Sequence, residues 1–380
     1  KRTFTLKFYR VTTIKSKSNL KLLHLIKKIV SAKSLNWYLK KHFSKYSVVF
    51  GFKTKNKNMS YLDTTYDVYK TAAITPDVGL CCTTTPIWQL PGLKIPIIMQ
   101  QMNYGCGSTV NPRDLSNNPV ILYVGVGGGM ELLQFSYFNR RKGGVVGVDI
   151  VDEMLEASAK NFIIAEHEND WFSSDFVELR KGSALDLPVE DNTIDVAAQN
   201  CLFNIFKMDD LKLALSEMYR VLKPGGRLVL SDPTCETKMS DTLINDERLR
   251  ALCLSGALTL DDYLKTITET GFGTVEVRAK RPYRILDPKH YDTDQLIYIE
   301  SVEVCAIKDP MPTDGPCIFT GKTAIYYGDD AFFDDNKGHT LVQNQPISVC
   351  DKTAGALKNL GRDDIFISES TFFYDGGGCC

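Results

Sequence analysis

The stretch Val120–Phe135, VILYVGVGGGMELLQF, decides the fold. Its first five residues are apolar and predict a buried strand, and the residues after the glycines predict a helix. Gly125, Gly127 and Gly129 have G-x-G-x-G spacing, which lets backbone N–H groups approach a ligand because no Cβ lies in the way. A glycine-rich turn after a strand is also a common structural connection. Taken alone, the stretch therefore favours a nucleotide-type site without establishing one.

A second predicted strand, 144–149, ends in an acid twenty residues after Gly129. An acid at that place, here Asp149, accepts hydrogen bonds from ribose hydroxyls, although it can also be an ordinary turn residue. The dinucleotide fingerprint has Gly at its sixth position, where this chain has Met130. The pattern therefore departs from an NAD-binding fold and resembles the class I S-adenosylmethionine (SAM) methyltransferases.

Composition indicates a globular chain with two different charge regimes. The 380 residues are 43% hydrophobic and 24% charged, and no run of 18 apolar residues predicts a membrane span. Of the 45 Lys and Arg residues, 16 lie in 1–58, which contains no Asp or Glu, so the remainder holds 29 basic against 46 acidic residues. An acidic body argues against nucleic acid as a partner. Eleven cysteines, an odd number without a secretory signal, predict reduced thiols in the cytosol or an organelle.

Strands alternate with helices through the middle of the chain, which predicts an α/β fold with a doubly wound parallel sheet and right-handed crossovers. Ligands in such sheets bind at the carboxyl ends of strands, where Gly125, Asp149, Asp186 and Cys201 fall. From Pro282 onward the pattern predicts a smaller α+β domain. The predicted strands are 120–124, 144–149, 176–181, 194–199, 227–231, 273–278, 295–307, 324–328 and 365–373, and the main predicted helices are 152–165, 209–222, 246–255, 261–270 and 353–360.

Four regions follow from these changes in composition. They are a basic extension (1–58), a cysteine-bearing helical and loop segment (59–116), the methyltransferase-like domain (117–280) and a C-terminal α+β domain (281–380) with a Cys379-Cys380 tail. The extension is compatible with a targeting peptide, a membrane-surface segment or a translated leader before Met59. In each case we expect it to be dispensable for the chemistry. The expected location is the cytoplasm, or a plastid if 1–58 is a targeting peptide.

Four cysteine motifs resemble those of the arsenite (As(III)) SAM-dependent methyltransferases. The resemblance covers about residues 60–380 and is closest to the branch linked to arsenosugar formation. Two departures stand out: Tyr123 replaces the acid that often begins the glycine motif, and Ser183 replaces a second acid. The first leaves open how the SAM ammonium group is held. The matching motifs are Cys81-Cys82, Tyr104-Gly105-Cys106-Gly107, Asn200-Cys201 followed by Asn204, and Cys253-Leu-Ser-Gly256-Ala-Leu.

The resemblance implies methyl transfer from SAM to a small-molecule substrate, trivalent arsenic. It implies arsenic ligation by Cys106, Cys201 and Cys253, and we expect Cys82 (or Cys81) to form a redox-active pair with Cys106. A reducing thiol system, thioredoxin or glutathione, is the expected partner. The residues that it implies for SAM binding are Gly125, Gly127, Gly129, Asp149, Met154, Ala184, Leu185 and Asn200.

Other interpretations remain open at this stage. A cysteine at a strand end is often only a small buried hydrophobe, which would make Cys201 and Cys253 structural. A zinc site would usually show a C-x-x-C pair, which the sequence lacks. The chain could also methylate a small organic or thiol substrate, or bind a metalloid without catalysis.

Overall fold

The strand of the glycine stretch, β1 (Ile121–Val124), lies inside the main sheet between β2 and β4. The computed structural model describes residues 60–77, 80, 90–291 and 293–372. All four β1 side chains are buried, and successive ones enter different cores. Ile121 and Tyr123 pack into one hydrophobic cluster, and Leu122 and Val124 pack into another. Period-two alternation with both faces apolar is typical of a strand in a sheet covered on both sides.

The main sheet has nine strands in the order β3-β2-β1-β4-β5-β8-β7-β9, with β6 paired to β5. The five strands from β3 to β5 are parallel, and β8 is antiparallel to both of its neighbours. The predicted class I, doubly wound fold is therefore confirmed. The strands are β2 (Val145–Asp149), β3 (Val177–Lys181), β4 (Ile194–Asn200), β5 (Leu222–Cys235), β6 (Leu258–Thr259), β7 (Thr274–Leu286), β8 (Ile297–Ile307) and β9 (Cys317–Phe319).

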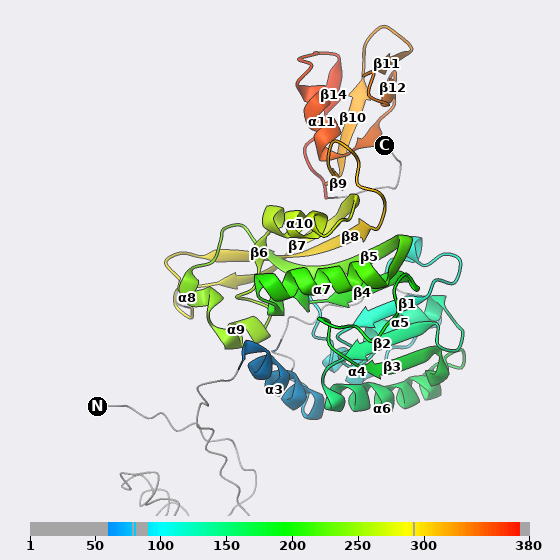
Figure 1. Ribbon diagram of the computed structural model, residues 1–380, viewed down its shortest axis with the longest axis vertical. Coiled ribbons are helices and arrows are strands. Elements are labelled where there is room, and N and C mark those ends of the chain that lie inside the picture. The colour runs from blue at the N-terminus through cyan, green and yellow to red at the C-terminus, as the bar shows by residue number, and fades with distance from the viewer. Residues whose placement is uncertain (1–59, 78–79, 81–89, 292, 373–380) are drawn as a thin grey trace, which may run out of the picture. The chain divides into compact units, whose positions relative to one another are not determined.

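Helices cover both faces of this sheet (Figure 1). One core contains side chains of α5 and α6, and the other contains side chains of α7 and α10. Helix α7 illustrates the cause, because Leu211, Leu215 and Met218 recur at helical spacing and are all buried. The helices are α3 (Tyr61–Ile74), α4 (Ile97–Gln101), α5 (Met130–Phe138), α6 (Asp152–Glu168), α7 (Met208–Val221), α8 (Asp241–Ile244), α9 (Glu247–Ala251) and α10 (Leu260–Glu269), with short 3-10 turns η1 (Pro112–Asp114), η2 (Ser174–Phe176) and η3 (Phe203–Ile205).

Three local predictions differ from the structure. β8, expected in the C-terminal domain that begins at 281, lies in the main sheet between β5 and β7. The single helix expected over 246–255 is instead the short helix α9, which ends at Ala251. The strand expected to begin at 227 extends back to Leu222, with an irregularity in its pairing to β4.

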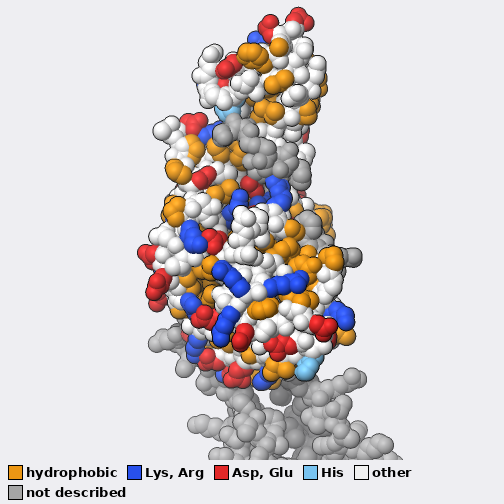
Figure 2. Space-filling model, turned by 90° about the vertical axis from the view of Figure 1, so that its right-hand side faces the viewer, with side chains coloured by type: hydrophobic (Ala, Val, Ile, Leu, Met, Phe, Trp, Pro, Cys, Tyr) orange, Lys and Arg blue, Asp and Glu red, His pale blue; other side chains and the backbone are white. Residues whose placement is uncertain are grey.

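The C-terminal part has its own small core. A three-stranded antiparallel sheet in the order β13-β10-β14 packs with α11, and β11 pairs with β12. Tyr327, Phe332 and Phe366 are more than half exposed there, and the upper part of Figure 2 shows hydrophobic side chains beside acidic ones. The elements are β10 (Lys322–Tyr326), β11 (Phe332–Asp334), β12 (Thr340–Val342), β13 (Ile347–Val349), α11 (Asp351–Lys358) and β14 (Ile365–Ile367).

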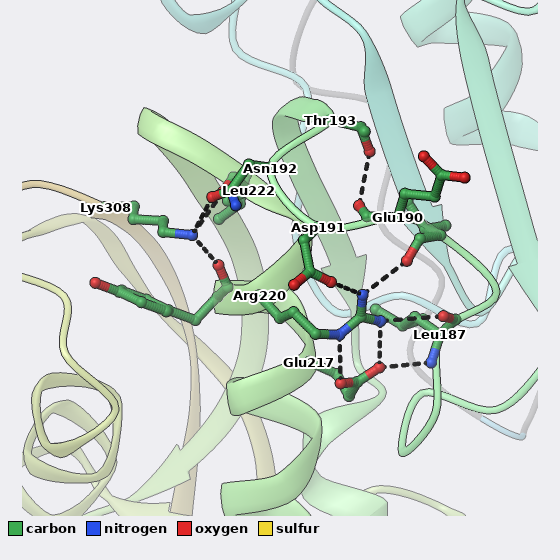
Figure 3. A network of polar contacts seen from close by, with 11 residues as sticks. Leu187, Glu190, Asp191, Asn192, Thr193, Glu217, Arg220, Leu222 and Lys308 are labelled. Atoms are coloured by element: carbon green, nitrogen blue, oxygen red, sulfur yellow. Dashed lines mark hydrogen bonds and ion pairs between the residues drawn. The ribbon is translucent and has the colours of Figure 1, made fainter.

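Arg220, near the end of α7, ties this helix to the loop that follows β3 (Figure 3). Its guanidinium is 2.6 Å from both Asp191 and Glu217, and it also donates to the backbone carbonyls of Leu187 and Val189. Glu217 in turn accepts from the Leu187 N–H at 2.7 Å. The network therefore fixes the loop just after residues 183–185, which line the pocket described below.

Within the described residues, no helix is both long and apolar enough to cross a membrane. Residues 1–58, the Cys81-Cys82 pair and the Cys379-Cys380 tail lie outside the described part, and so do the predictions made for them.

Candidate active site

The glycine turn after β1 has a backbone that side chains rarely adopt. Gly125, Gly127 and Gly129 have φ angles of 83°, 52° and 86°. All three lie in the left-handed region, which glycine enters without a Cβ penalty. Gly129 is the N-cap of α5, so the turn leads directly into the N-terminus of that helix. The N–H groups of Gly125, Gly128 and Gly129 already donate to backbone carbonyls, so the glycines serve close approach of a ligand to the turn rather than a set of free donors.

A pocket opens over this turn, at the carboxyl ends of β1, β2 and β4. Helix α3 and the segment 102–105 also contribute to its walls. Among the described residues that line it, Glu131 and Asp149 carry charge and none is Lys, Arg or His. The pocket therefore favours a cationic ligand. Of the residues predicted to bind SAM, those that line it are Gly125, Gly127, Asp149, Met154, Ala184, Leu185 and Asn200.

Gly129, the remaining predicted residue, does not line the pocket. A Cβ at this position would lie 2.8 Å from the Phe162 ring and 3.3 Å from Ser158, both on α6. Position 129 requires glycine because the turn packs closely against α6 and because the backbone there has a left-handed φ.

Asp149 ends β2 and lies at the rim of the glycine turn. Its carboxylate accepts hydrogen bonds from the Val126 N–H at 3.0 Å and the Val151 N–H at 2.9 Å. Burial raises its pKa to about 6, although these hydrogen bonds act in the opposite direction. The carboxylate is therefore held by backbone groups on both sides while it faces the pocket.

Cys201 and Cys253 share an unusual backbone. Their φ angles are 63° and 57°, and the other described non-glycine residues with positive φ are five asparagines and Phe372. Asparagine tolerates this region, whereas other L-residues lose roughly 1–2 kcal/mol there. Two cysteines held in such a conformation indicate that something other than local stability selects them.

The end of helix α9 explains the backbone conformation of Cys253. The Leu254 N–H donates to Leu249 O and the Cys253 N–H donates to Arg250 O, both at 2.9 Å, directly after α9. This pair of bonds is a Schellman motif, with Cys253 at the C′ position that glycine usually occupies. The motif turns the Cys253 thiol toward Cys201, whose carbonyl accepts from it at 2.6 Å. Cys201 lines the pocket, and so does Tyr69, whose hydroxyl is 3.9 Å from the Cys253 sulfur.

Cys106 is close to this pair in the fold but its thiol has other neighbours. The Cys106 sulfur is 3.5 Å from the hydroxyls of Ser231 and Ser301. Its backbone N–H donates to Asn200 Oδ1 at 2.9 Å. The structure thus joins Cys201 and Cys253 directly, and it links Cys106 to them through the Asn200 side chain. Within the described part of the chain, no three His, Cys, Asp or Glu side chains form a metal-type cluster, and Cys82 lies outside it.

The glycines that flank Cys106 are explained by close packing. A Cβ on Gly105 would lie 2.3 Å from Asn200 Nδ2, and one on Gly107 would lie 2.2 Å from Ser231 Oγ. The Tyr-Gly-Cys-Gly segment therefore lies directly against the ends of β4 and β5. Only glycine at both places lets Cys106 approach so closely.

Comparison with known proteins agrees with this geometry. A methyltransferase domain model matches residues 122–230. An arsenite methyltransferase of Halobacterium salinarum is 30% identical over 179 residues, which are 47% of this chain and 44% of that protein, less than half of its length. One from Aquipseudomonas alcaligenes is 28% identical over 292 residues, covering 73% of this chain and 81% of the relative. The chain is therefore similar to arsenite methyltransferases, in the second case over 73% of its length.

A solved structure has the same fold as this chain. The crystal structure of an arsenic (III) S-adenosylmethionine methyltransferase from Chlamydomonas reinhardtii has a TM-score of 0.52 and 21% identity, and covers 77% of this chain and 99% of that one. At this identity the likeness shows the fold. The matching domain and the arsenite methyltransferase relatives, rather than this likeness, support a SAM-dependent methyltransferase.

The pocket fits SAM, the methyl donor of this class. SAM carries a sulfonium and an ammonium group, which suit walls whose charged side chains are two acids. Met154, which is buried, lines the pocket together with Ala184 and Leu185, and these apolar side chains suit an adenine ring. When bound, SAM supplies an electrophilic methyl group.

Sequence reasoning missed two buried acids of this region. Glu131, in the first turn of α5, is only 6% exposed and lines the pocket. Asp232 is fully buried at the end of β5, accepts from the Tyr263 hydroxyl at 2.6 Å, and burial raises its pKa to about 7. The available signal was an acid inside an otherwise apolar stretch, which for Glu131 is MELLQF.

Replacing Asp149 tests its expected role on the ribose. We expect Asp149→Asn to weaken binding of S-adenosylhomocysteine by roughly 10- to 100-fold, because a charged acceptor contributes about 1.5–3 kcal/mol. Since the pKa of Asp149 is about 6, wild-type affinity should rise between pH 5 and pH 7 as the carboxyl ionises. This rise should be smaller in the variant. Calorimetric titration at several pH values measures both effects, and unchanged affinity would remove Asp149 from the site.

Proposed function

We propose that the protein transfers a methyl group from SAM to trivalent arsenic held by the thiolates of Cys201 and Cys253. The observation that carries this proposal is the contact between these two left-handed cysteines beside the pocket: Cys201 lines it, and the Cys253 sulfur lies 2.6 Å from the Cys201 carbonyl oxygen. Arsenic(III) is a soft centre that prefers thiolate to oxygen ligands. Two thiols from separate elements, one after β4 and one after α9, form a site only because the fold joins them.

The chemistry needs placement more than acid–base catalysis. The arsenic lone pair forms the new As–C bond while the S–CH₃ bond of SAM breaks, and its electron pair stays on the sulfur of S-adenosylhomocysteine. A lone pair needs no general base. Holding both reactants in line can supply roughly 7–11 kcal/mol of the barrier.

The transfer takes arsenic formally from the trivalent to the pentavalent state, so each further cycle needs a two-electron reductant. We propose that Cys106 and Cys82 act as a redox-active dithiol and that an external thiol, thioredoxin or glutathione, restores them. Cys106 would also serve as a third, exchangeable arsenic ligand. Its backbone bond to Asn200, itself a pocket residue, supports this position beside the site. We also propose that this methylation takes part in arsenosugar formation.

One reaction mixture tests the proposed function. Protein, SAM, a thiol and arsenite are combined, and methylated arsenicals are identified by mass spectrometry. We expect monomethyl and further methylated products together with an equivalent amount of S-adenosylhomocysteine. SAM turnover that is indifferent to arsenite would instead point to a small organic or thiol substrate. Arsenite binding without SAM turnover would indicate a metalloid-binding protein.

A further inference from the structure

Glu131 is a buried carboxylate at the pocket wall that the methyl transfer itself does not use. It lies in the first turn of α5, six residues after Gly125, and is 6% exposed. Asp149 is the other charged residue among those that line the pocket in the described part of the chain. The two carboxylates have different kinds of hydrogen-bond partner. Asp149 is bonded to the backbone at 126 and 151, whereas Glu131 is bonded to the side chains of Asn200, Thr109 and Tyr123.

The surrounding hydrogen bonds fix the Glu131 carboxylate and leave one of its oxygens able to accept a further hydrogen bond. Oε1 accepts from the Thr109 hydroxyl at 2.7 Å, from the Thr109 N–H at 3.2 Å and from Asn200 Nδ2 at 3.2 Å. Oε2 accepts from the Tyr123 hydroxyl. A carboxylate oxygen has two acceptor sites, so Oε2 can take a further donor from the pocket. Burial raises the pKa of Glu131, and a cation next to it would favour its ionised form.

We propose that Glu131 binds the α-ammonium group of SAM, with Tyr123 orienting the carboxylate. This inference rests on the use of SAM in the proposed function. The sulfonium has no N–H to donate, whereas the ammonium has three, so the ammonium is the cationic group that a carboxylate binds by hydrogen bonds. With the ribose at Asp149, the amino acid end of SAM is left for Glu131, the other acid among the described residues that line the pocket. Tyr123 stands where an acid often begins the glycine motif, and Glu131 would supply the missing charge from α5.

The same contacts connect this subsite to the cysteines. Thr109, which donates twice to Glu131, lies three residues after Cys106. Asn200 donates from Nδ2 to both Glu131 and the Gly107 carbonyl, and its Oδ1 accepts from the Cys106 N–H. The residues that hold Glu131 are therefore also those that hold the Cys106 segment in place.

Two ligands that differ only at the amino acid end test the proposal. S-adenosylhomocysteine contains the ammonium group, whereas 5′-methylthioadenosine keeps the adenosine and sulfur but lacks that end. By calorimetry, we expect Glu131→Gln to lower the affinity for S-adenosylhomocysteine roughly 10- to 100-fold, as for the loss of a charged hydrogen bond. Its affinity for 5′-methylthioadenosine should change less than about twofold. The matched variant Asp149→Asn should weaken both ligands, because both contain the ribose.

The outcomes distinguish a failure of the Glu131 assignment from a failure of the proposed use of SAM. Equal losses for both ligands in Glu131→Gln, or an unchanged affinity for S-adenosylhomocysteine, would overturn the assignment. If that variant does not fold, Tyr123→Phe gives the same test, with a smaller selective loss for S-adenosylhomocysteine expected and equal losses contradicting it. A wild-type protein that binds neither ligand would instead overturn the proposed use of SAM.

Discussion

Cys201→Ser and Cys253→Ser are each expected to abolish methylation of both arsenite and a monomethyl trivalent arsenical, while binding of S-adenosylhomocysteine remains. Each variant removes one thiol of the Cys201–Cys253 pair, and a serine hydroxyl is a hard oxygen ligand that arsenic(III) disfavours. Cys106→Ser is expected to impair the first methylation and to spare the second. A methyl group replaces one thiolate on arsenic, so the monomethyl substrate needs only two cysteines.

The measurements are initial rates with each substrate and calorimetry with S-adenosylhomocysteine. Cys235→Ser is the matched control, because Cys235 is also buried but its thiol donates to Ala257 O at 3.3 Å. A serine can make that bond, and burial raises the pKa of Cys235 to about 11, which disfavours a thiolate. We expect normal rates from this variant. Normal methylation of either substrate by Cys201→Ser or Cys253→Ser would place the arsenic elsewhere.

The second large effect is expected from Gly256→Ala. A Cβ on Gly256 would lie 1.8 Å from Asn204 O and 2.8 Å from the carbonyl carbon of the same residue. The obstacle is backbone, so no side chain can swing away, and the segment after Cys253 must separate from the turn that follows Cys201. We expect the free energy of unfolding to fall by about 1–3 kcal/mol or more, because overpacking forces the backbone to shift. Arsenite affinity should fall as well.

Gly355→Ala is the control for this substitution. Gly355 lies inside α11, and a Cβ there would have nothing within 4 Å. Alanine should raise the free energy of unfolding by up to about 1 kcal/mol, because glycine is the poorer helix former. Denaturant unfolding of both variants compares the two, and a Gly256→Ala variant as stable as Gly355→Ala would mean that the two segments do not touch.

The parallel half of the fold could be predicted because each of its strands and helices has its own local pattern. β1 is continuously apolar, α7 has helical spacing, and the glycines mark the turn between β1 and α5. The place of β8 could not be predicted, because an antiparallel strand alternates in the same way whether it pairs with β5 and β7 or starts a new domain.

The sequence predicts the site residues that belong to a motif. It does not predict those that reach the site only through tertiary packing. Cys201 at the end of β4 and Asp149 at the end of β2 follow from strand order. The left-handed conformation of Cys253 could not be predicted from the sequence. A cysteine occupies the C′ position, where a glycine would have marked the end of α9. Glu131 was missed because helical spacing alone does not show that its neighbours Tyr123, Thr109 and Asn200 converge on it.

The central claim is that Cys201 and Cys253 hold arsenic by sulfur next to the SAM pocket. X-ray absorption at the arsenic edge of the arsenite-loaded full chain measures the atoms bound to arsenic directly. We predict sulfur neighbours in the wild-type protein and their loss in the double variant Cys201→Ser with Cys253→Ser. An arsenic environment of oxygen in the wild type, or a sulfur environment unchanged in the double variant, would contradict the account.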